Sequence, residues 1–336
     1  MIRGKELPKR KLISLLQQPF MFIAQWRNLP AYELISYFFM FASVTMLAYG
    51  IKPYNYEIIK IIFLTVLTMY SGFFAALIWN DITDVDIDAI AHPTRPLPSG
   101  RINTKKFFGI ALIFSTLTFI FALLISVWCL TIVGLAALFV AFHNKFLKRK
   151  MKLPAYSEIF SPFQWIVVAI FGFFAIWTAL PQSSNIILNI SFFGNISTNS
   201  RAIQQMTLLI IFTYFADNAH DIAEGVHDAD ADLMHGVKTY ATTFGLKKAV
   251  RISFIMFVIS GIFGILLFLK SILSPVFLCF FLLLFIYTLI FAIRFFKSDE
   301  VDFEKEGVFV GRKLYDYFLF SYNIIFLDLL IQILLF

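Results

Sequence analysis

Long apolar runs separated by short polar stretches dominate the pattern of hydrophobic and polar positions along this chain. Runs of about 20 residues are long enough to cross a hydrocarbon core of roughly 30 Å as helices. The period-two alternation of a barrel strand is absent, and a helix satisfies its own backbone hydrogen bonds in lipid. The pattern therefore predicts an all-α membrane fold. Nine spans are expected, at 31–51, 56–79, 107–124, 127–142, 158–181, 203–219, 248–270, 275–296 and 317–336.

The composition leaves little room for soluble domains. Hydrophobic residues make up 60% of the 336 residues and charged residues only 15%. We expect one polytopic membrane domain over 1–336, with the nine helices in a single bundle around a central cavity that opens near the cytoplasmic face. Residues 1–26 would form a basic cytoplasmic segment. The first 20 residues lack the apolar region and small-residue cleavage site that a cleaved targeting peptide would show.

The basic residues are distributed unequally between the two sides of the predicted bundle. With the N-terminus in the cytoplasm, 24 of the 28 Lys and Arg residues fall on the cytoplasmic side, and only Lys52, Lys60, Arg201 and Lys270 on the other. The positive-inside rule is therefore satisfied. This bias accounts for the net charge of +7 without nucleic acid as a partner. We expect an integral protein of a bacterial or archaeal cell membrane, or of an organelle membrane, with the mouth of its site on the cytoplasmic side.

Four carboxylates follow the second predicted span within eight residues, in the segment NDITDVDID. Ionisable groups at the edge of a span are expensive unless they are paired, line a wet cavity or hold a metal. On a helix, Asn80, Asp84 and Asp88 share one face, where three oxygen ligands make a hard-cation site. Asp81 is placed near the same face, whereas Asp86 points elsewhere. The alternative is an acidic helix terminus in the interface, although acids favour helix N-termini and these lie at a C-terminus.

A second acidic cluster follows the sixth predicted span, in the segment DNAHDIAEGVHDADAD. Asp228 and Asp232 repeat the four-residue spacing, and Asp221 lies near their face if the helix persists through Gly225. Two carboxylate stripes that face each other repel strongly in a cavity of low dielectric. Divalent cations bound between the stripes would remove this repulsion.

Both clusters are followed by the same kind of segment. A Gly-containing turn leads into a basic helix start at 99–101 in the first case and at 236–238 in the second. This similarity suggests two related helical halves that face each other across a cavity.

The ligand types favour Mg²⁺ as the bound cation. Both clusters offer oxygen ligands, and Mg²⁺ is usually held by one or two carboxylates together with substrate phosphates. Zinc is the alternative, but His220 and His227 are seven residues apart and make no well-spaced pair. Cations suited to a polyanion lie nearby, although the positive-inside bias alone would explain most of them: Arg27, Arg95, Arg101, Lys148 and Arg149. A substrate with a diphosphate head and a long hydrocarbon tail fits this combination.

These motifs resemble the signatures of the UbiA superfamily of intramembrane prenyltransferases, in particular its 4-hydroxybenzoate polyprenyltransferase-like members. NDITDVDID followed by HPTRPLPSGRI is similar to the first signature, Asn-x-x-x-Asp-x-x-x-Asp with an Arg-Pro-x-Pro-Ser-Gly segment. Asp228-x-x-x-Asp232, followed by Gly236, Lys238 and Thr239, is similar to the second. The resemblance implies that two Mg²⁺ ions bridge an isoprenyl diphosphate. The implied metal ligands are Asn80, Asp84, Asp88, Asp228 and Asp232, and the four aspartates are the implied catalytic residues.

The same resemblance implies further substrate contacts. Arg27 and Lys148 would contact the diphosphate or the acceptor, and Arg149 would bind the acceptor carboxylate of 4-hydroxybenzoate-type members. The remaining residues expected at the substrate are Asn80, Arg95 and Asp221. The second motif departs from the commonest form, because His227 stands beside Asp228 and no tyrosine closely precedes it.

The function implied is Mg²⁺-dependent transfer of an isoprenyl group, by ionisation to an allylic cation. The acceptor would be an aromatic quinone precursor, as in isoprenoid quinone biosynthesis, or another lipid-soluble molecule. Alternatives within the superfamily are a tetrapyrrole, a glycerol phosphate lipid or a phosphoribosyl acceptor, and cyclisation of the prenyl chain. A cation-coupled transporter is an alternative from another class, but it would carry isolated acids deep in several spans.

Overall fold

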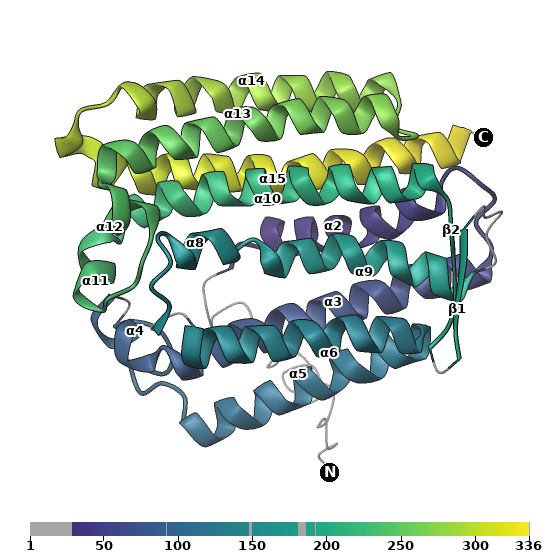
Figure 1. The fold of residues 1–336 in the computed structure, drawn as a ribbon, viewed down its shortest axis with the longest axis horizontal. Helices are drawn as coiled ribbons and strands as arrows, with labels where there is room; N and C mark the ends of the chain where they lie inside the picture. Colours follow the sequence, from purple (N-terminus) through teal and green to yellow (C-terminus); the bar gives the residue numbers. More distant parts are fainter. Residues whose placement is uncertain (1–28, 92, 148–149, 181–185, 192, 336) are drawn as a thin grey trace, which may run out of the picture.

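The structure is a computed structural model in which residues 29–91, 93–147, 150–180, 186–191 and 193–335 are described. Within these residues the long helices run roughly parallel to one another (Figure 1). They are α2 (Ala31–Tyr49), α3 (Tyr56–Thr83), α5 (Thr104–Ile125), α6 (Val127–Phe142), α9 (Phe163–Ala179), α10 (Ser200–His227), α13 (Leu246–Lys270), α14 (Pro275–Lys297) and α15 (Phe303–Leu335). The predicted helical class is confirmed.

Eight helices in the described part of the chain are long and apolar enough to cross a membrane, as expected of an integral membrane protein. The other long helix is α10, which takes the place of the predicted span 203–219. Its C-terminal half is polar, since Asp217, Asn218, His220 and Asp221 follow one another there. Asp217 and Asn218 are fully buried in the bundle, so the protein interior, rather than lipid, surrounds them.

The predicted boundaries are wrong at three places. The last helix begins at Phe303 rather than at 317, because charged residues in its first turns find partners on other helices. The sixth span extends to His227 rather than ending at 219. The predicted span 158–181 is divided into α8 (Tyr156–Phe160) and α9, with Pro162 between them. Proline has no N–H to donate and interrupts a continuous helix.

Helices α10 and α15 pack together in the interior of the bundle, where α10 also contacts α13 and α15 also contacts α2 and α14. Two glycines of α15, one turn apart, allow this approach. A Cβ on Gly307 would lie 2.7 Å from the carbonyl oxygen of Ala223, and one on Gly311 would lie 2.5 Å from Cγ of Glu224. Small residues at four-residue spacing let membrane helices approach closely. Charged side chains of α15 are thereby brought beside the polar part of α10.

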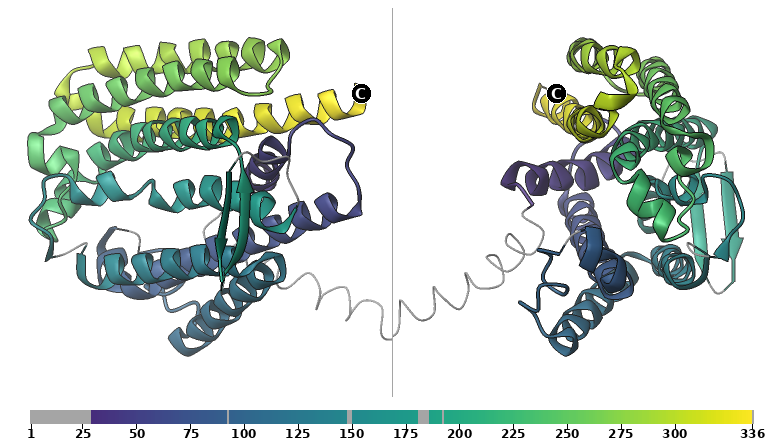
Figure 2. Two further views of the ribbon diagram at one scale, coloured as in Figure 1. Left: turned by 45° about the vertical axis from the view of Figure 1, so that its right-hand side comes forward. Right: turned by 90° about the vertical axis from the view of Figure 1, so that its left-hand side faces the viewer.

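On the other side of the bundle, α3 packs against α5, and α6 packs against both α5 and α9 (Figure 2). Most buried apolar residues belong to one large cluster around α2, α9, α10, α13 and α15. A smaller cluster joins α3 to α5 through Phe74, Ile78, Phe107 and Ala111.

The two ends of the bundle differ. At one end lie α4 (Val85–Ala91), α11 (Ala229–Met234), α12 (Tyr240–Phe244) and α8, and we call this the motif end because Asp84 and Asp228 lie there (Figure 1). A π-helical turn, η1 (His143–Leu147), and a 3₁₀ turn, η2 (Glu300–Asp302), connect helices at this end. At the other end an antiparallel hairpin joins α9 to α10, formed by β1 (Ile186–Ile190) and β2 (Gly194–Thr198).

The hairpin lies between the predicted spans 158–181 and 203–219. Its strands are rich in isoleucine, and Gly194 begins β2 with φ +83°, a conformation that glycine adopts without strain. Pairing runs from Ile186 with Thr198 to Ile190 with Gly194. The hairpin lies on the outside of the helices, and the core of the fold remains helical (Figure 2).

Candidate active site

The first acidic motif lies at a break between a long helix and a short one. Asn80 belongs to the last turn of α3, Asp84 stands between α3 and α4, and Asp88 belongs to α4. The backbone N–H of Asp84 donates to the carbonyl of Asn80 (2.9 Å), and that of Asp88 donates to Asp84 (2.8 Å). These bonds keep the four-residue spacing through the break. Asp81, Asp84 and Asp88 are only 2–4% exposed, whereas Asp86 is exposed.

Arg95 lies in the turn after α4 and is directed back onto this motif. Its Nη1 lies 2.5 Å from Oδ1 of Asp88 and 4.0 Å from Oδ1 of Asp81. The other oxygen of Asp88, Oδ2, is buried and has no hydrogen-bond partner among the described residues. Arg95 therefore pairs with Asp88 and lies near Asp81, and Asp84, the third buried carboxylate, stands on the same segment.

Arg101 closes the same turn rather than reaching the acids. Its Nε donates to Oγ of Ser99 (3.1 Å), its Nη2 donates to the carbonyl of Thr94, and Ser99 Oγ donates to the carbonyl of Arg95 (2.6 Å). Gly100 has φ +71°, which allows the chain to reverse toward α5. The turn thereby fixes the backbone that carries Arg95.

The second acidic motif has the same local structure as the first. Asp228 stands at the break between α10 and α11, and the N–H of Asp232 donates to the carbonyl of Asp228 (2.9 Å). Gly236 follows with φ +70°, and the side chain of Thr239 then caps α12, as that of Asn103 caps α5 after Gly100. A long helix, a break at an aspartate, a short helix, a glycine turn and a capped helix thus occur twice. This repetition supports the hypothesis of two related halves.

Both motifs lie at the motif end, on α4 and α11 (Figure 1). Among the described residues, no three Asp, Glu, His or Cys side chains converge as they would in a closed metal site. The arrangement instead offers oxygen ligands on two separate segments, including Oδ2 of Asp88, which is buried and has no hydrogen-bond partner in the described part of the chain. This suits Mg²⁺, which keeps several waters and shares its coordination between a few carboxylates and substrate phosphates.

Glu158 of α8 contacts the segment that follows the second motif. It is 5% exposed, and its Oε2 accepts a hydrogen bond from the backbone N–H of Tyr240. A Cβ on Gly225 would lie 2.4 Å from its Oε1, so only glycine leaves room for this carboxylate. Gly225 therefore does not interrupt α10 but admits Glu158. Burial raises the pKa of Tyr240, and nearby Tyr214 and Glu158 raise it further, so its hydroxyl is neutral at pH 7.

Asp221 was expected at the substrate, and the structure gives it partners within the protein. Its Oδ2 accepts a hydrogen bond from Oγ of Ser161, and its Oδ1 lies 3.0 Å from Nε2 of His220. Nδ1 of His220 lies 3.4 Å from Oδ1 of Asp217. Asp221 thus joins α10 to the segment between α8 and α9.

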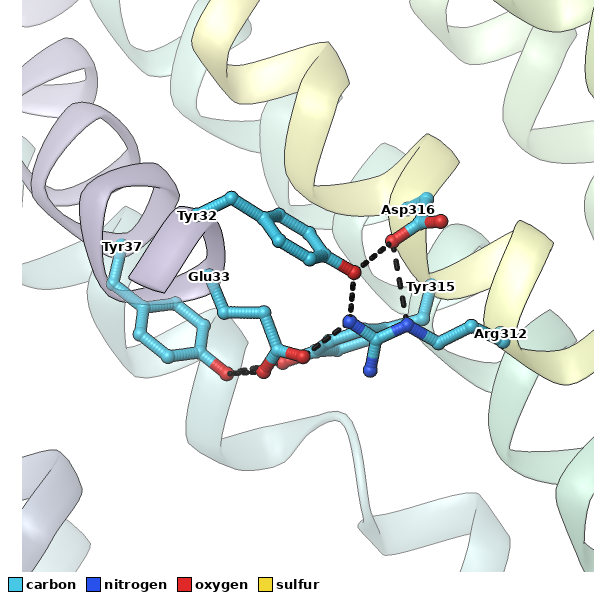
Figure 3. Close-up of polar contacts among 6 residues, drawn as sticks. All are labelled: Tyr32, Glu33, Tyr37, Arg312, Tyr315 and Asp316. Atoms are coloured by element: carbon cyan, nitrogen blue, oxygen red, sulfur yellow. Dashed lines mark hydrogen bonds and ion pairs between the residues drawn. The ribbon is translucent and has the colours of Figure 1, made fainter. Parts of the chain in front are cut away.

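A polar cluster that the hydropathy pattern did not predict joins α2 to α15 (Figure 3). The guanidinium of Arg312 donates to Oε1 of Glu33 and to the hydroxyl of Tyr32, and its Nε lies 3.5 Å from Oδ1 of Asp316. The Tyr32 hydroxyl donates to the same Asp316 oxygen (3.1 Å). Two helices far apart in sequence are therefore held together at the motif end by one arginine.

The cluster continues into the core through two tyrosines. The Tyr37 hydroxyl donates to Oε2 of Glu33 (3.3 Å) and lies 2.5 Å from that of Tyr315 (Figure 3). The Tyr315 ring is 4.8 Å from the His220 ring. Glu33 is a carboxylate inside the predicted span 31–51, a signal that could have identified it. Arg312 gave no such signal, because the predicted boundary at 317 left it in a loop.

A cavity of about 480 Å³ lies between α3, α5, α6 and α9. At the motif end its lining is polar, with Thr83, Asn144, Lys145 and Gln164. Farther in, the lining is apolar and aromatic. Thr83 directly precedes Asp84, so the cavity opens beside the first acidic motif. The expected sites at Arg27, Lys148 and Arg149 and the segment 1–26 lie outside the described residues.

Two comparisons with known sequences agree. A model of the UbiA prenyltransferase family matches residues 36–309. A digeranylgeranylglyceryl phosphate synthase from Saccharolobus solfataricus is 26% identical over 180 residues, which are 54% of this chain and 55% of that protein. A synthase of the same name from Methanosphaera stadtmanae is 26% identical over 238 residues, 71% of this chain and 76% of that protein. The chain spans about half the length of the first of these relatives.

Solved structures share the fold at low sequence identity. The apo structure of a UbiA homolog from Aeropyrum pernix K1 superposes with a TM-score of 0.66 at 17% identity, covering 90% of this chain and 99% of that chain. A UbiA homolog from Archaeoglobus fulgidus, bound to DMAPP and Mg²⁺, has a TM-score of 0.51 at 14% identity, covering 85% and 96%. The likeness is one of fold.

Proposed function

The chain belongs to the UbiA prenyltransferase family, and from this membership we propose that it transfers an isoprenyl group from an isoprenyl diphosphate to a lipid-soluble acceptor, with Mg²⁺. The observation that carries the proposal is the pair of acidic motifs at one end of the bundle, with an apolar cavity opening beside the first. The diphosphate would lie between the motifs and the hydrocarbon chain in the cavity. The Archaeoglobus fulgidus homolog bound to DMAPP and Mg²⁺ supports the choice of donor and metal.

For the acceptor we propose a glycerol phosphate lipid before an aromatic quinone precursor. The relatives from Saccharolobus solfataricus and Methanosphaera stadtmanae are both named digeranylgeranylglyceryl phosphate synthases. An aromatic carboxylate acceptor was expected only through Arg149. It remains the second candidate, and no described residue favours it.

The reaction breaks the allylic C–O bond of the donor, and the electron pair leaves with the diphosphate. Two Mg²⁺ ions, held by Asn80, Asp84 and Asp88 on one side and by Asp228 and Asp232 on the other, would neutralise the charge that develops on the leaving group. A bond then forms between the allylic carbon and the acceptor oxygen or carbon, and the acceptor proton passes to a base. The apolar lining of the cavity excludes water that would otherwise capture the allylic cation.

We also propose that the motif end faces the cytoplasm. Lys and Arg gather in the segments at this end, which the positive-inside rule assigns to the cytoplasmic side. A diphosphate could then reach the site from the aqueous phase while its tail enters between the helices.

The direct test is turnover by the purified protein in detergent, followed by mass spectrometry of the lipid extract. The assay contains geranylgeranyl diphosphate, Mg²⁺ and, in parallel, a geranylgeranylglyceryl phosphate and 4-hydroxybenzoate. We expect a prenylated glycerol phosphate lipid. Asp84→Asn and Asp228→Asn should each reduce kcat at least about a hundredfold, since each removes one ligand charge from a leaving-group site.

Asp86→Asn is the matched control, because Asp86 lies between Asp84 and Asp88 in sequence but is exposed. This variant should keep its activity. Equal losses of kcat in Asp86→Asn and Asp84→Asn would mean that the total negative charge at the motif end matters rather than a defined ligand set. Undiminished turnover in both Asp84→Asn and Asp228→Asn would refute the proposed metal site.

A further inference from the structure

The cavity between α3, α5, α6 and α9 is elongated along the helix axes. Helix α3 contributes Thr83 at the motif end and then Trp79, Ala76, Gly72 and Met69, about one turn apart. Successive residues on the other three helices also line it from the polar to the apolar end. The cavity therefore runs along the helices rather than across them.

The width of the cavity comes from small residues. Gly72 and Ala76 form its α3 wall, and Ala136, Ala137 and Ala141 form its α6 wall. A Cβ on Gly72 would meet Cγ2 of Thr118 at 3.4 Å, so α3 and α5 pack closely there and close this side of the cavity. The mostly apolar lining of the cavity suits a hydrocarbon chain.

The far end of the cavity is closed by large side chains. Met69 of α3 is 6% exposed, Phe41 of α2 is 1% exposed, and Val133 of α6 is 5% exposed. Phe119 of α5 is half-buried and lies one turn beyond Ser115, toward the same end. These four side chains form the floor opposite the polar mouth.

We propose that this floor, chiefly Met69 and Phe119, sets the longest isoprenyl chain that the protein accepts as donor; the inference rests on the proposed function. Thr83 and Met69 are 14 residues apart, which is about 21 Å along a helix. An extended chain advances roughly 1.2 Å per bond, so a four-bond isoprenyl unit spans roughly 4.8 Å and the channel holds about four units. The occupant is the donor chain rather than an acceptor chain, because the mouth adjoins the motif proposed to hold the diphosphate.

The test compares geranyl, geranylgeranyl and hexaprenyl diphosphates with one fixed acceptor. The wild-type protein should prefer geranylgeranyl to hexaprenyl diphosphate by at least about tenfold in kcat/KM, since overfilled apolar pockets discriminate on that scale. Met69→Ala should reduce this preference by about tenfold. Ala76→Phe narrows the middle of the channel and should instead favour geranyl over geranylgeranyl diphosphate by a similar factor.

Leu112→Ala is the control, because Leu112 is an exposed residue of α5 outside the cavity lining, and its donor profile should match that of the wild type. Absence of turnover with every donor in the wild type would contradict the proposed function itself. If the wild type is active but Met69→Ala and Ala76→Phe both keep its donor profile, the proposed role of the floor is overturned while the proposed function stands. The role of the floor would also be overturned if Met69→Ala and Ala76→Phe changed only the preference for the chain length of the acceptor, measured with geranylgeranyl diphosphate as the donor.

Discussion

Replacing Arg312 by methionine should destabilise the bundle through Glu33. The Glu33 side chain is 3% exposed, and without Arg312 its carboxylate keeps, among the described residues, only the hydroxyl of Tyr37, at 3.3 Å. Removing one partner of a fully buried ion pair costs about 3–5 kcal/mol, because the other charge is left without compensation. Arg312 is 37% exposed, so water screens part of the interaction. We therefore expect a loss of about 2–3 kcal/mol in the free energy of unfolding.

A double-mutant cycle separates the ion pair from the other contacts of Arg312. Glu33→Gln keeps the shape of the side chain but removes the buried charge, so it should cost less than Arg312→Met. In the double variant the loss of the arginine no longer strands a carboxylate. The two substitutions should therefore couple by at least about 1 kcal/mol. The measurement is unfolding in mixed micelles with rising denaturing detergent, followed by far-ultraviolet circular dichroism.

Arg294→Met supplies the matched control. Arg294 of α14 also pairs with a glutamate of α15, Glu306, at 2.5 Å, but its side chain is 66% exposed. The Glu306 side chain is 15% exposed, against 3% for Glu33, so removing Arg294 leaves a less deeply buried carboxylate and should cost clearly less than Arg312→Met. Equal losses for Arg312→Met and Arg294→Met, or additive effects at Arg312 and Glu33, would refute the reasoning from burial.

Three further outcomes are expected. Arg95→Gln should lower the thermal stability of the metal-free protein, since it leaves Asp88 without its ion pair. Saturating Mg²⁺ should restore most of this loss. An equal loss with and without Mg²⁺ would argue against metal binding at Asp88. Gly307→Ala should lower the free energy of unfolding by about 1–3 kcal/mol, because the added Cβ would collide with a backbone carbonyl of α10. A Cβ on Gly109 meets nothing within 4 Å, so Gly109→Ala should leave the same free energy unchanged or raise it. EDTA should abolish turnover, and activity should return with Mg²⁺ but not with Zn²⁺; recovery with Zn²⁺ alone would contradict the oxygen-ligand assignment.

The sequence alone determined the helical membrane class and most helix positions. Bilayer thickness and the need for internal backbone hydrogen bonds constrain each span locally, so an apolar run is sufficient to locate it. The predicted 127–142 and the observed α6 agree at both ends. Family membership was also within reach of the sequence, because both acidic motifs are short, local patterns.

Only the tertiary structure decided which groups meet. That Arg95 pairs with Asp88, that Gly225 is required by Glu158, and that Arg312 joins α15 to α2 depend on contacts between segments distant in sequence. The charges near 303–316 belong to a helix rather than a loop because other helices supply their partners, which a hydropathy pattern cannot reveal. The cavity likewise exists only through the packing of α3, α5, α6 and α9. Spacing along one helix is fixed by local geometry, whereas the partner of a buried charge is fixed by the fold.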